Sequence, residues 1–600
     1  MKNRTLFFCI FFILTGAITL TDTRSLYGPY LLAAVFGIFC LLKIKNIDCP
    51  RKTRGYRLVL AASLISAIFI TLANYDIWQH PELPEDCTVL FSRLVKLMLI
   101  FFIMAGTFTC TLCILVYTIF VEKAFTVLTV QVDRRRLTLS FLIPFCLISL
   151  IYLTVYFSSY FPGLMSLDSI DQVRQIYTGT YSNHQPFYHT MILGAFIRAG
   201  LMIFGDINRA VMLYVVFQIL FMAASFAYVT YNIASLGMPR WMIRLAAAWY
   251  ALMPFHIMFS FTVWKDVFFG AFVTILIILL IRIERDMAGF WTYVAFALFS
   301  VLICLIRSNG LFAYVFVFAG VVLLMRKHRS LLVMMPLVIV LSFVLKHNVL
   351  SSLNVVQPDT VESLSIPLQQ ISRVIAEGGY MTPEDEAFLS NIIDVSSIKD
   401  IYDPDISDPI KNAIRDFGNE EYLTKNMGSF AQVYLRTVIH NPSLCVFAWV
   451  DSTCGYWNSG YNYWVWFWDV EENDLGISRT VFSPGVLRFM DRYLWLFYNV
   501  RAFQLFTAIG MFVWIVLVLF VRSIAKKNRA GIIAAVPILA TLLSLLVSSP
   551  VYAEFRYMYP LFTALPILFA ITFKGGTARL TKAAAADPVE NEVDTPEEDN

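Results

Sequence analysis

The sequence predicts an all-α polytopic membrane protein of about 14–16 transmembrane helices, with a small, mainly helical extracytoplasmic domain. Hydrophobic residues make up 58% of the 600 residues and charged residues only 15%, whereas soluble chains carry about 25% charged residues. Apolar runs recur along nearly the whole chain, and runs of about 17–25 residues can cross ~30 Å of hydrocarbon as helices. A helix also satisfies its own backbone hydrogen bonds within lipid.

The apolar runs place the candidate spans at residues 5–20, 27–44, 58–75, 92–121, 136–158, 186–204, 209–236, 241–262, 266–282, 288–306, 310–325, 330–348, 501–521, 530–548 and 556–573. The first run follows a basic start, as in a signal peptide, but further spans follow at once, which favours an uncleaved helix. The expected units are N-terminal accessory helices (1–130), a transmembrane module (131–348) with its first outer loop at 159–186, an extracytoplasmic domain (349–500), C-terminal helices (501–574) and a disordered cytoplasmic tail (575–600).

Charge predicts which side of the membrane each loop faces, because short cytoplasmic loops are enriched in Lys and Arg. The basic loops expected inside are 43–57, 133–136, 282–285, 326–329 and 522–529. This arrangement places 76–87, 159–186, 264–266, 307–310, 349–500 and 548–560 outside.

One parity conflict remains in this topology, because a single span at 209–236 would put the basic "GMPR" (237–240) on the outer side. We expect 209–236 to form a hairpin of two short helices, with "GDINR" and "GMPR" both cytoplasmic. The alternative is that one basic loop breaks the charge rule.

The ten cysteines are scattered, most of them inside apolar runs. Cys110 and Cys113 form a CxxC pattern within a predicted span, where buried small hydrophobic residues are expected rather than a redox or metal pair. Cys445 and Cys454 lie in or near the polar region, and the sequence leaves open whether they form a disulfide.

Ionisable and polar residues cluster at the ends of spans on the predicted outer face. Each has a structural alternative: Asp168 can cap a helix, the histidines can lie at the interface, and Lys265 can anchor there beside Trp264. Charges near membrane depth are costly and tend to mark function, so together they favour one site. The candidates are Asp168, Asp171, His184, Gln185, His189, Lys265, Asp266, Arg307, Asn309, Glu554 and Arg556.

The types of residue in this set limit the chemistry. The sequence has no Gly-rich phosphate loop and no Cys/His spacing typical of zinc, so neither nucleotide nor zinc binding is expected, and no nucleic-acid partner is predicted. Lys265, Arg307 and Arg556 can hold a phosphate or pyrophosphate. A carboxylate can deprotonate an attacking hydroxyl. These groups suit glycosyl transfer from a polyprenyl-phosphate sugar.

Several short motifs occur in the same order as in a known superfamily. An acidic outer loop, "PGLMSLDSIDQ", precedes "HQPFYH" (184–189) and "FG" (204–205), and "IRSNG" and "FRYMYPL" follow later. This order resembles the lipid-dependent glycosyltransferases of the GT-C superfamily, which include protein mannosyltransferase and aminoarabinose transferase types and uncharacterised bacterial relatives. The usual motif is "(H/K)PP(L/F)Y", and Gln185 stands where its first Pro is expected. In addition, "SIPLQQISRV" in the polar domain resembles a family of bacterial membrane proteins of unknown function.

The resemblance implies a GT-C-like bundle in which 131–348 is the catalytic module of an inverting glycosyltransferase. Asp168 would be the general base, with Asp171 as its rival, and the pair would orient one another or help hold Mg²⁺ or Mn²⁺, which only some relatives need. The other implied roles are donor-phosphate binding by Lys265, Arg307 and Arg556, and substrate binding by His184, Gln185, His189, Asp266, Asn309 and Glu554. Trp457, Trp464, Trp466 and Trp468 would stack on a glycan or seat the domain at the membrane interface.

The implied partners are a polyprenyl-phosphate sugar, a glycan, lipid or protein acceptor, and membrane lipids. The implied location is the bacterial cell membrane, with the active site facing outward. A transporter or flippase of lipid-linked glycans would use a similar basic cavity without a base. A glycan polymerase or ligase would look much the same in sequence. An acyltransferase is disfavoured, because the cytoplasmic loops lack a His-Asp motif.

Overall fold

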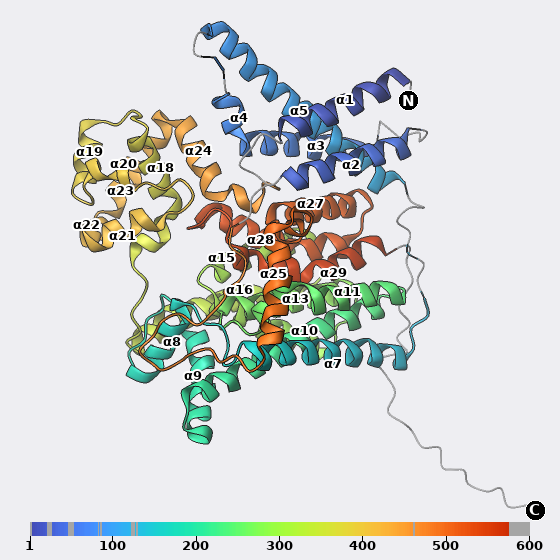
Figure 1. Ribbon diagram of the computed structural model, residues 1–600, viewed down its shortest axis with the longest axis vertical. Coiled ribbons are helices and arrows are strands. Elements are labelled where there is room, and N and C mark those ends of the chain that lie inside the picture. Colours follow the sequence, from blue (N-terminus) through green and yellow to red (C-terminus); the bar gives the residue numbers. More distant parts are fainter. Residues whose placement is uncertain are drawn as a thin grey trace, which may run out of the picture.

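The protein is an all-α polytopic membrane protein (Figure 1). The computed structural model describes residues 3–20, 27–45, 53–81, 83–84, 87–121, 127, 130–459 and 463–574, so the predicted tail 575–600 lies outside them. Within these ranges, nine helices are long and apolar enough to cross a membrane, or up to eleven if each of two bent helix pairs is one span. Shorter apolar helices account for the remaining predicted spans.

The main bundle is built around α13 (Lys265–Glu284), whose apolar window is 94% buried. Apolar residues surround this helix on all sides, which is typical of a helix enclosed by other helices. The other helices of the bundle are α7 (Arg134–Ser159), α10 (Ile207–Ser235), α11 (Arg240–Leu252), α12 (Pro254–Ser260), α14 (Phe290–Ile306), α15 (Gly310–Leu324), α16 (Arg329–Val344), α27 (Ile509–Ala525), α28 (Arg529–Ser548) and α29 (Tyr559–Phe573). The α16 helix continues through a π-helical turn, η1 (Leu345–Val349), into α17 (Leu350–Ser352).

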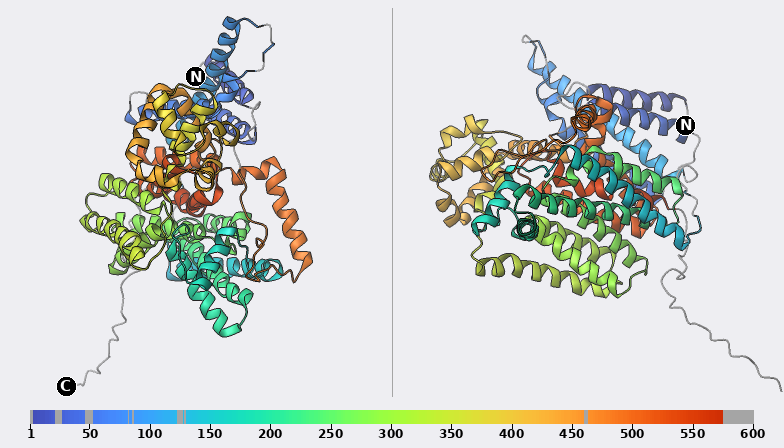
Figure 2. Two further views of the ribbon diagram at one scale, coloured as in Figure 1. Left: turned by 90° about the vertical axis from the view of Figure 1, so that its left-hand side faces the viewer. Right: turned by 60° about the horizontal axis from the view of Figure 1, so that its bottom comes forward.

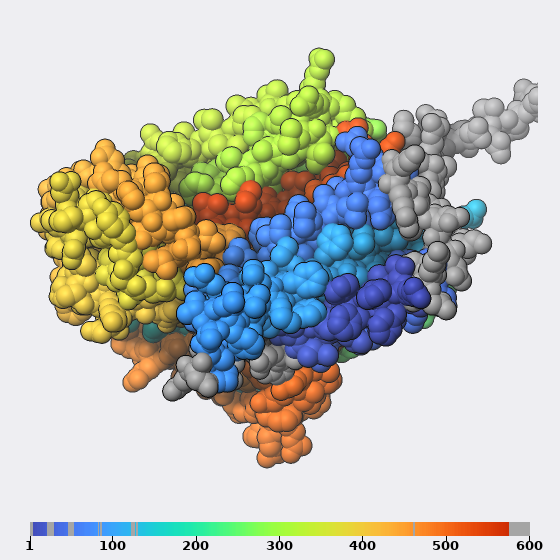
Figure 3. Space-filling view, turned by 90° about the horizontal axis from the view of Figure 1, so that it is seen from above, coloured from blue at the N-terminus to red at the C-terminus, as the bar shows by residue number. Residues whose placement is uncertain are grey.

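The N-terminal helices form a separate layer beside α27 (Figures 1 and 3). They are α1 (Asn3–Thr19), α2 (Tyr27–Ile44), α3 (Arg54–Ala73), α4 (Tyr75–Gln79) and α5 (Val89–Phe120). A Cβ on Gly106 would lie 2.6 Å from the Cα of Gly16, so these two glycines let α1 and α5 approach closely. Cys110 and Cys113 of α5 are free thiols within this layer.

Residues 360–453 form a helical cap with its own apolar core at one end of the bundle (yellow and light orange in Figures 1 and 3). Thus the polar region is mainly helical, as predicted. Cys445 and Cys454 are both buried, free thiols and form no disulfide. The helices of the cap are η2 (Thr360–Leu364), α18 (Ser365–Ala376), α19 (Pro383–Ser390), η3 (Val395–Ser397), α20 (Ile398–Ile401), α21 (Asp408–Asp416), α22 (Glu420–Lys425), α23 (Met427–His440) and α24 (Pro442–Thr453).

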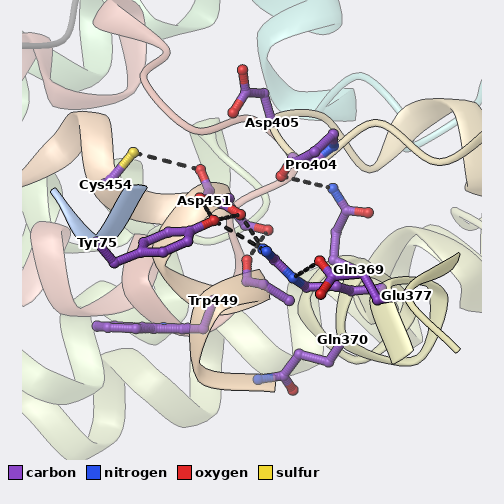
Figure 4. A network of polar contacts seen from close by, with 12 residues as sticks. Tyr75, Gln369, Gln370, Glu377, Pro404, Asp405, Trp449, Asp451 and Cys454 are labelled. Atoms are coloured by element: carbon purple, nitrogen blue, oxygen red, sulfur yellow. Dashed lines mark hydrogen bonds and ion pairs between the residues drawn. The ribbon is translucent and has the colours of Figure 1, made fainter. Parts of the chain in front are cut away.

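A buried polar network ties the cap to the N-terminal layer (Figure 4). The Tyr75 hydroxyl lies 2.8 Å from Oδ2 of Asp451, and Arg373 of α18 bonds both groups. Arg373 Nε also pairs with Glu377 at 2.7 Å. Burial raises the pKa of Asp451 to about 6, and the Arg373 charge only partly offsets this effect. The network therefore connects three elements that are far apart in sequence.

The basic loops meet at one end of the bundle, which we call the basic end. The carboxylate of the buried Glu284 lies there, 3.0 Å from Arg529 Nε and 3.3 Å from His328 Nε2. Lys327 Nζ lies 3.7 Å from the same carboxylate. The opposite end, where α13 begins at Lys265, is called the site end. Three of the loops that the charge rule grouped together, 282–285, 326–329 and 522–529, are thus in contact.

The predicted hairpin at 209–236 is wrong, because α10 is one continuous helix of 29 residues. It starts at the site end, where Asn208 Nδ2 donates to Gly476 O at 3.1 Å. It finishes at the basic end, where Val130 N, just before α7, donates to Gly237 O at 2.9 Å. A single crossing thus brings "GMPR" to the basic end.

The number of crossings before "GMPR" agrees with the charge rule because α9 (Phe187–Phe204) does not cross the bundle. Gln185, just before α9, accepts a hydrogen bond from Lys265 at the site end. The other end of α9 leads directly into α10, which also starts there. Figures 1 and 2 show α9 running crosswise to α7 and α10. The predicted span 186–204 therefore lies at one end of the bundle, and "GDINR" shares the face of the candidate site.

The chain returns from the cap along the site end to α25 (Pro484–Asn499), which also runs crosswise to the bundle (Figures 1 and 2). Its inward face buries Met490, Leu494 and Phe497, whereas Phe489 and Trp495 are exposed. After α25, the short helices α26 (Arg501–Gln504) and η5 (Leu505–Thr507) meet α27 at a 60° bend.

Candidate functional site

The loop 159–186 is held against the segments that surround the site. Leu164 N donates to Phe261 O at 2.9 Å, and Ser169 Oγ donates to Val263 O at 2.5 Å. The loop contains α8 (Leu167–Thr178), and Asp168 lies in its first turn. The side chain of Asp168 keeps 38% exposure, so a substrate hydroxyl can reach it.

The start of α13 is fixed by a buried amide. Gln218 of α10 donates through Nε2 to the carbonyls of Phe259 (3.2 Å), Ser260 (3.0 Å) and Thr262 (2.8 Å). These carbonyls belong to the last turn of α12 and to the break that follows it before α13, where the helical hydrogen bonds stop. Because buried backbone oxygens need partners, the amide stabilises this break and thereby positions Lys265 and Asp266.

Arg556 lies at the centre of the site. Its Nη1 donates to Asp168 Oδ2 at 3.3 Å, and its Nε lies 3.1 Å from Glu554 Oε1. The guanidinium also stacks over the rings of Trp264 at 5.2 Å and Trp464 at 5.8 Å from their centroids. A planar guanidinium suits this arrangement, since it combines forked donors with ring stacking.

Arg307 forms a second ion pair deeper in the protein. Its Nη1 lies 3.1 Å from Oδ1 of Asp266, whose side chain is fully buried, and also donates to Tyr557 O at 3.2 Å. The guanidinium stacks on the Tyr557 ring at 4.2 Å. The contact to Asp266 lacks hydrogen-bond alignment, so both carboxylate oxygens retain acceptor capacity.

Lys265 completes the set of cations. It donates to the buried Gln185, and its charge interacts with those of Asp168, Asp266, Arg307 and Arg556. Three cations and three carboxylates from α8, α13, the α14–α15 turn and the segment before α29 therefore meet at the site end. The sequence predicted this convergence from loop charges alone.

The two carboxyl groups that contact Arg556 differ in protonation. Burial raises the pKa of Asp168, but the charges of Lys265, Arg556 and His184 outweigh it and hold the pKa below its ordinary value. Burial raises the pKa of Glu554 to about 7, although Arg556 opposes this shift. Asp168 is thus ionised at neutral pH, whereas Glu554 exchanges its proton near neutrality. Such divergent environments are typical of acid–base sites.

The structure separates the two candidate bases. Asp171 accepts a hydrogen bond from Gln175 Nε2 at 2.8 Å within α8, while Asp168 faces the cations. His184 is exposed, and its charge acts on Asp168, on Glu362 of the cap and on Asp359 just before the cap. His184 therefore lies where the cap approaches the site.

His189 and Asn309, two other residues predicted to bind substrate, lie in environments that differ from each other. His189 is fully buried, with Nδ1 3.0 Å from Gln172 Oε1 and Nε2 2.8 Å from the Tyr214 hydroxyl. These contacts join α8, α9 and α10, and they occupy both ring nitrogens of His189. Asn309 stands at the N-cap position of α15 but makes no side-chain cap bond.

Sequence reasoning missed Lys346 and Tyr557. Lys346 lies in the π-helical turn and donates to Arg307 O and Ser308 O, each at 3.2 Å, so it supports the turn that carries Arg307. Single π-turns are frequent at functional sites, but they leave no clear sequence pattern. Tyr557 follows Arg556 directly, and its place in "FRYMYPL" was the one feature of the sequence that could have indicated it.

The tryptophans near residue 460 do not act as one surface. Trp457 and Trp466 are almost fully buried, so neither can stack on a glycan nor seat the domain at the membrane interface. Trp457 packs on Phe69 and Trp449 instead. Trp464 stands beside Arg556, and Trp468 is 43% exposed.

The arrangement of Asp168 and Asp171 does not fit a divalent cation. Asp168 faces Arg556, and Asp171 is bonded to Gln175. Across the described ranges, no group of three or more His, Cys, Asp or Glu side chains is arranged to hold a metal ion. We therefore assign no chemical step to a metal.

Comparison with known proteins matches the chain to a family model. Residues 175–586 match the model of a family of unknown function, DUF6020. This range includes Lys265, Arg307 and Arg556 and begins just after Asp168. No curated protein and no solved structure matches the chain. Because the match covers more than half of its residues, the chain belongs to DUF6020, a family of unknown function.

Proposed function

We propose that this protein is an integral membrane glycosyltransferase that moves a sugar from a polyprenyl-phosphate donor to a hydroxyl-bearing acceptor. The observation that carries the proposal is the contact of Asp168 with Arg556 beside Lys265 and Arg307. An exposed, ionised carboxylate next to several cations suits a reaction in which a hydroxyl attacks and a phosphate leaves.

In the proposed reaction, Asp168 accepts the proton of the acceptor hydroxyl as its oxygen bonds to the anomeric carbon. The bond between that carbon and the phosphate oxygen breaks with inversion, and the bonding electrons remain on the phosphate. Arg556, Lys265 and Arg307 stabilise the charge that develops on the leaving group. Each step uses side chains that already lie at the site end.

Glu554 provides a way to admit the anionic donor. Arg556 is paired with both Asp168 and Glu554. Because the pKa of Glu554 is about 7, protonation of this carboxyl near neutrality would remove a negative charge beside Arg556. Among the described residues the Arg556 Nε–H has no hydrogen-bond partner, so it is available to a phosphate oxygen. The donor would then bind together with a proton.

The basic loops support the proposed location. The ends of the helices at the basic end carry Lys and Arg residues, as cytoplasmic loops do. With the basic end in the cytoplasm, the site would face the outer side of the cell membrane, where polyprenyl-linked sugars meet wall polymers, lipids, glycans or proteins. The GT-C resemblance agrees with this orientation.

A flippase for lipid-linked glycans is the second candidate, favoured by the broken helices. The α11–α12 pair bends by 57°, and the helix before α27 meets it at 60°. Broken helices are common in transporters, where they surround the substrate. A flippase would need the cations but no base.

The purified full-length protein in lipid vesicles tests the proposal. It would be incubated with polyprenyl-phosphate hexoses labelled in the sugar, and with glycerol or short glycans as acceptor probes. The proposal predicts a new glycosidic product and free polyprenyl phosphate. Movement of intact donor between leaflets without cleavage would support the flippase instead. A glycan comparison between cells with and without the protein would identify the natural product.

A further inference from the structure

A cavity of about 520 Å³ lies at the basic end, away from the candidate site. It opens between the start of α7 and the start of α11 and is lined by Arg136, Arg240, Trp241 and residues 130–133. Its volume falls within the range of small-ligand sites, about 300–1,000 Å³. The proposed transfer reaction uses none of these residues.

The cavity is built on fixed backbone. Arg136 Nη1 donates to Gln131 O at 3.2 Å, and Nη2 donates to Met238 O. The Asp133 side chain caps α7 by accepting from Arg136 N at 2.7 Å. These bonds join the segment before α7 to the segment before α11, so the walls hold a defined shape.

The positive charge of the cavity is not balanced by the protein. Arg240 is exposed, and within the described ranges it forms no ion pair. Its charge acts against that of Arg136 across the cavity. Asp133 is the one carboxylate in the lining, whereas Arg134 and Arg135, both exposed, add two more positive charges beside it. Two guanidinium groups that line one cavity favour an anion within it.

The backbone of α11 adds a second feature. The helix begins after Pro239, which supplies no side-chain cap bond to its first turn. The N-terminus of a helix carries partial positive charge and N–H groups that need acceptors. An anion in the cavity would meet this uncapped turn and both arginines together.

The outer rim of the cavity is apolar. Trp241 is 58% exposed and Leu245, one turn further along α11, is 63% exposed. On α7, Leu139 and Ile143 are also exposed, at 42% and 60%. Tryptophan is enriched at the headgroup level of membranes, and basic pockets between transmembrane helices bind acidic headgroups. The rim therefore provides surfaces for acyl chains beside a seat for a phosphate.

We propose that this cavity binds the phosphate headgroup of an anionic phospholipid from the leaflet at the basic end. Arg136, Arg240 and the first turn of α11 hold the phosphate, Trp241 lies at the glycerol level, and the acyl chains follow the exposed face of α7. This lipid site does not depend on the proposed transferase activity.

Thermal unfolding of the purified full-length protein in neutral detergent tests the lipid site. Short-chain phosphatidylglycerol, phosphatidylcholine of the same chain length and inorganic phosphate would be added at equal concentrations. A ligand that binds the folded state raises the midpoint of unfolding with its concentration. We expect phosphatidylglycerol to raise the Tm, and the other two probes to have little effect.

The matched variants are Arg240→Gln, Arg240→Lys and Arg326→Gln. Arg326 is an exposed arginine at the same end of the bundle that does not line the cavity. Loss of a charged hydrogen-bond donor predicts at least about tenfold weaker phosphatidylglycerol binding by Arg240→Gln. Arg240→Lys and Arg326→Gln should keep most of the shift, and all three variants should unfold like the parent without lipid.

Several results would overturn the assignment. Equal shifts with phosphatidylcholine would remove the role of charge. Equal shifts with inorganic phosphate would make this a phosphate site and not a lipid site. If Arg326→Gln weakens binding as much as Arg240→Gln does, the lipid is attracted by the general surface charge and not by this cavity.

Discussion

Arg556 Nη1 donates to Asp168 Oδ2 at 3.3 Å, across 388 residues of the chain. The contact joins the loop 159–186 to the segment just before the last helix, α29. It can form only if both segments lie at the same end of the bundle. The predicted function depends on this contact, because it sets a carboxylate beside the cations that would hold a phosphate.

Replacing Arg556 by Lys should impair use of the donor. The variant keeps the positive charge but loses the fork that reaches Asp168 and Glu554 and the flat surface that stacks on Trp264. We expect kcat/KM for a polyprenyl-phosphate sugar to fall by about 10–100-fold, since a charged hydrogen bond contributes roughly 1.5–3 kcal/mol. Transfer kinetics in vesicles would measure this. Arg174→Lys, in an exposed pair with Asp474, is the control and should change little.

The buried pair of Arg307 and Asp266 should matter for stability. Arg307→Gln leaves the carboxylate of Asp266 buried without its counter-charge, which typically costs about 3–5 kcal/mol. Arg174→Gln breaks an exposed pair and should cost about 1 kcal/mol or less. Thermal unfolding of both variants in one detergent would compare them. Equal losses would argue that the Arg307–Asp266 contact is not a buried ion pair.

Stability should depend on pH through Glu554. Its pKa in the folded protein is about 7, above the ordinary value of 4.5, so the folded state holds the proton more tightly. The resulting stabilisation is complete below about pH 4.5 and is lost as the pH rises through 7. The unfolding midpoint of Glu554→Gln should therefore fall less than that of the parent between pH 5 and pH 8. Because Asp451 also has a raised pKa, of about 6, part of the fall should remain in the variant. Parallel pH profiles for both proteins would contradict the assignment.

The crosswise position of α9 predicts a labelling pattern. In a variant in which all ten native cysteines are replaced, single cysteines at Thr180, before α9, and Arg209, after it, should react with a membrane-impermeant maleimide from the same side. A cysteine at Arg326 should react from the opposite side, since it lies at the basic end. Reaction of positions 180 and 209 from different sides would show that α9 crosses the membrane.

Much of the bundle could be predicted because long apolar runs have few stable alternatives in lipid. The loops at Glu284, Lys327 and Arg529 lie together at one end of the bundle, as the charge rule had grouped them. The run 186–204 is long and apolar enough for a span, as predicted, but its helix lies crosswise to α7 and α10. The tertiary contacts of its ends, not its composition, decide its direction.

The candidate site was predictable in membership but not in detail. Loop charges indicated that Asp168, Lys265, Arg307 and Arg556 share one face, and the structure brings them together. The burial of His189 between α8 and α10 depends on packing that a local pattern does not contain. The pKa of Glu554 likewise depends on how deeply the fold buries it, so no sequence motif could have distinguished it from Asp168.

The central claim is tested most directly by the transfer rate of Asp168→Asn, measured against Asp171→Asn in the same vesicles with the same labelled polyprenyl-phosphate sugar. Asn keeps the shape of Asp but cannot accept the proton, so we predict a fall of about 10²–10⁴-fold for Asp168→Asn. Asp171→Asn, three residues away and outside the cluster of cations, should stay within about threefold of the parent. Full activity in Asp168→Asn, or an equal loss in Asp171→Asn, would contradict the role of Asp168 as general base.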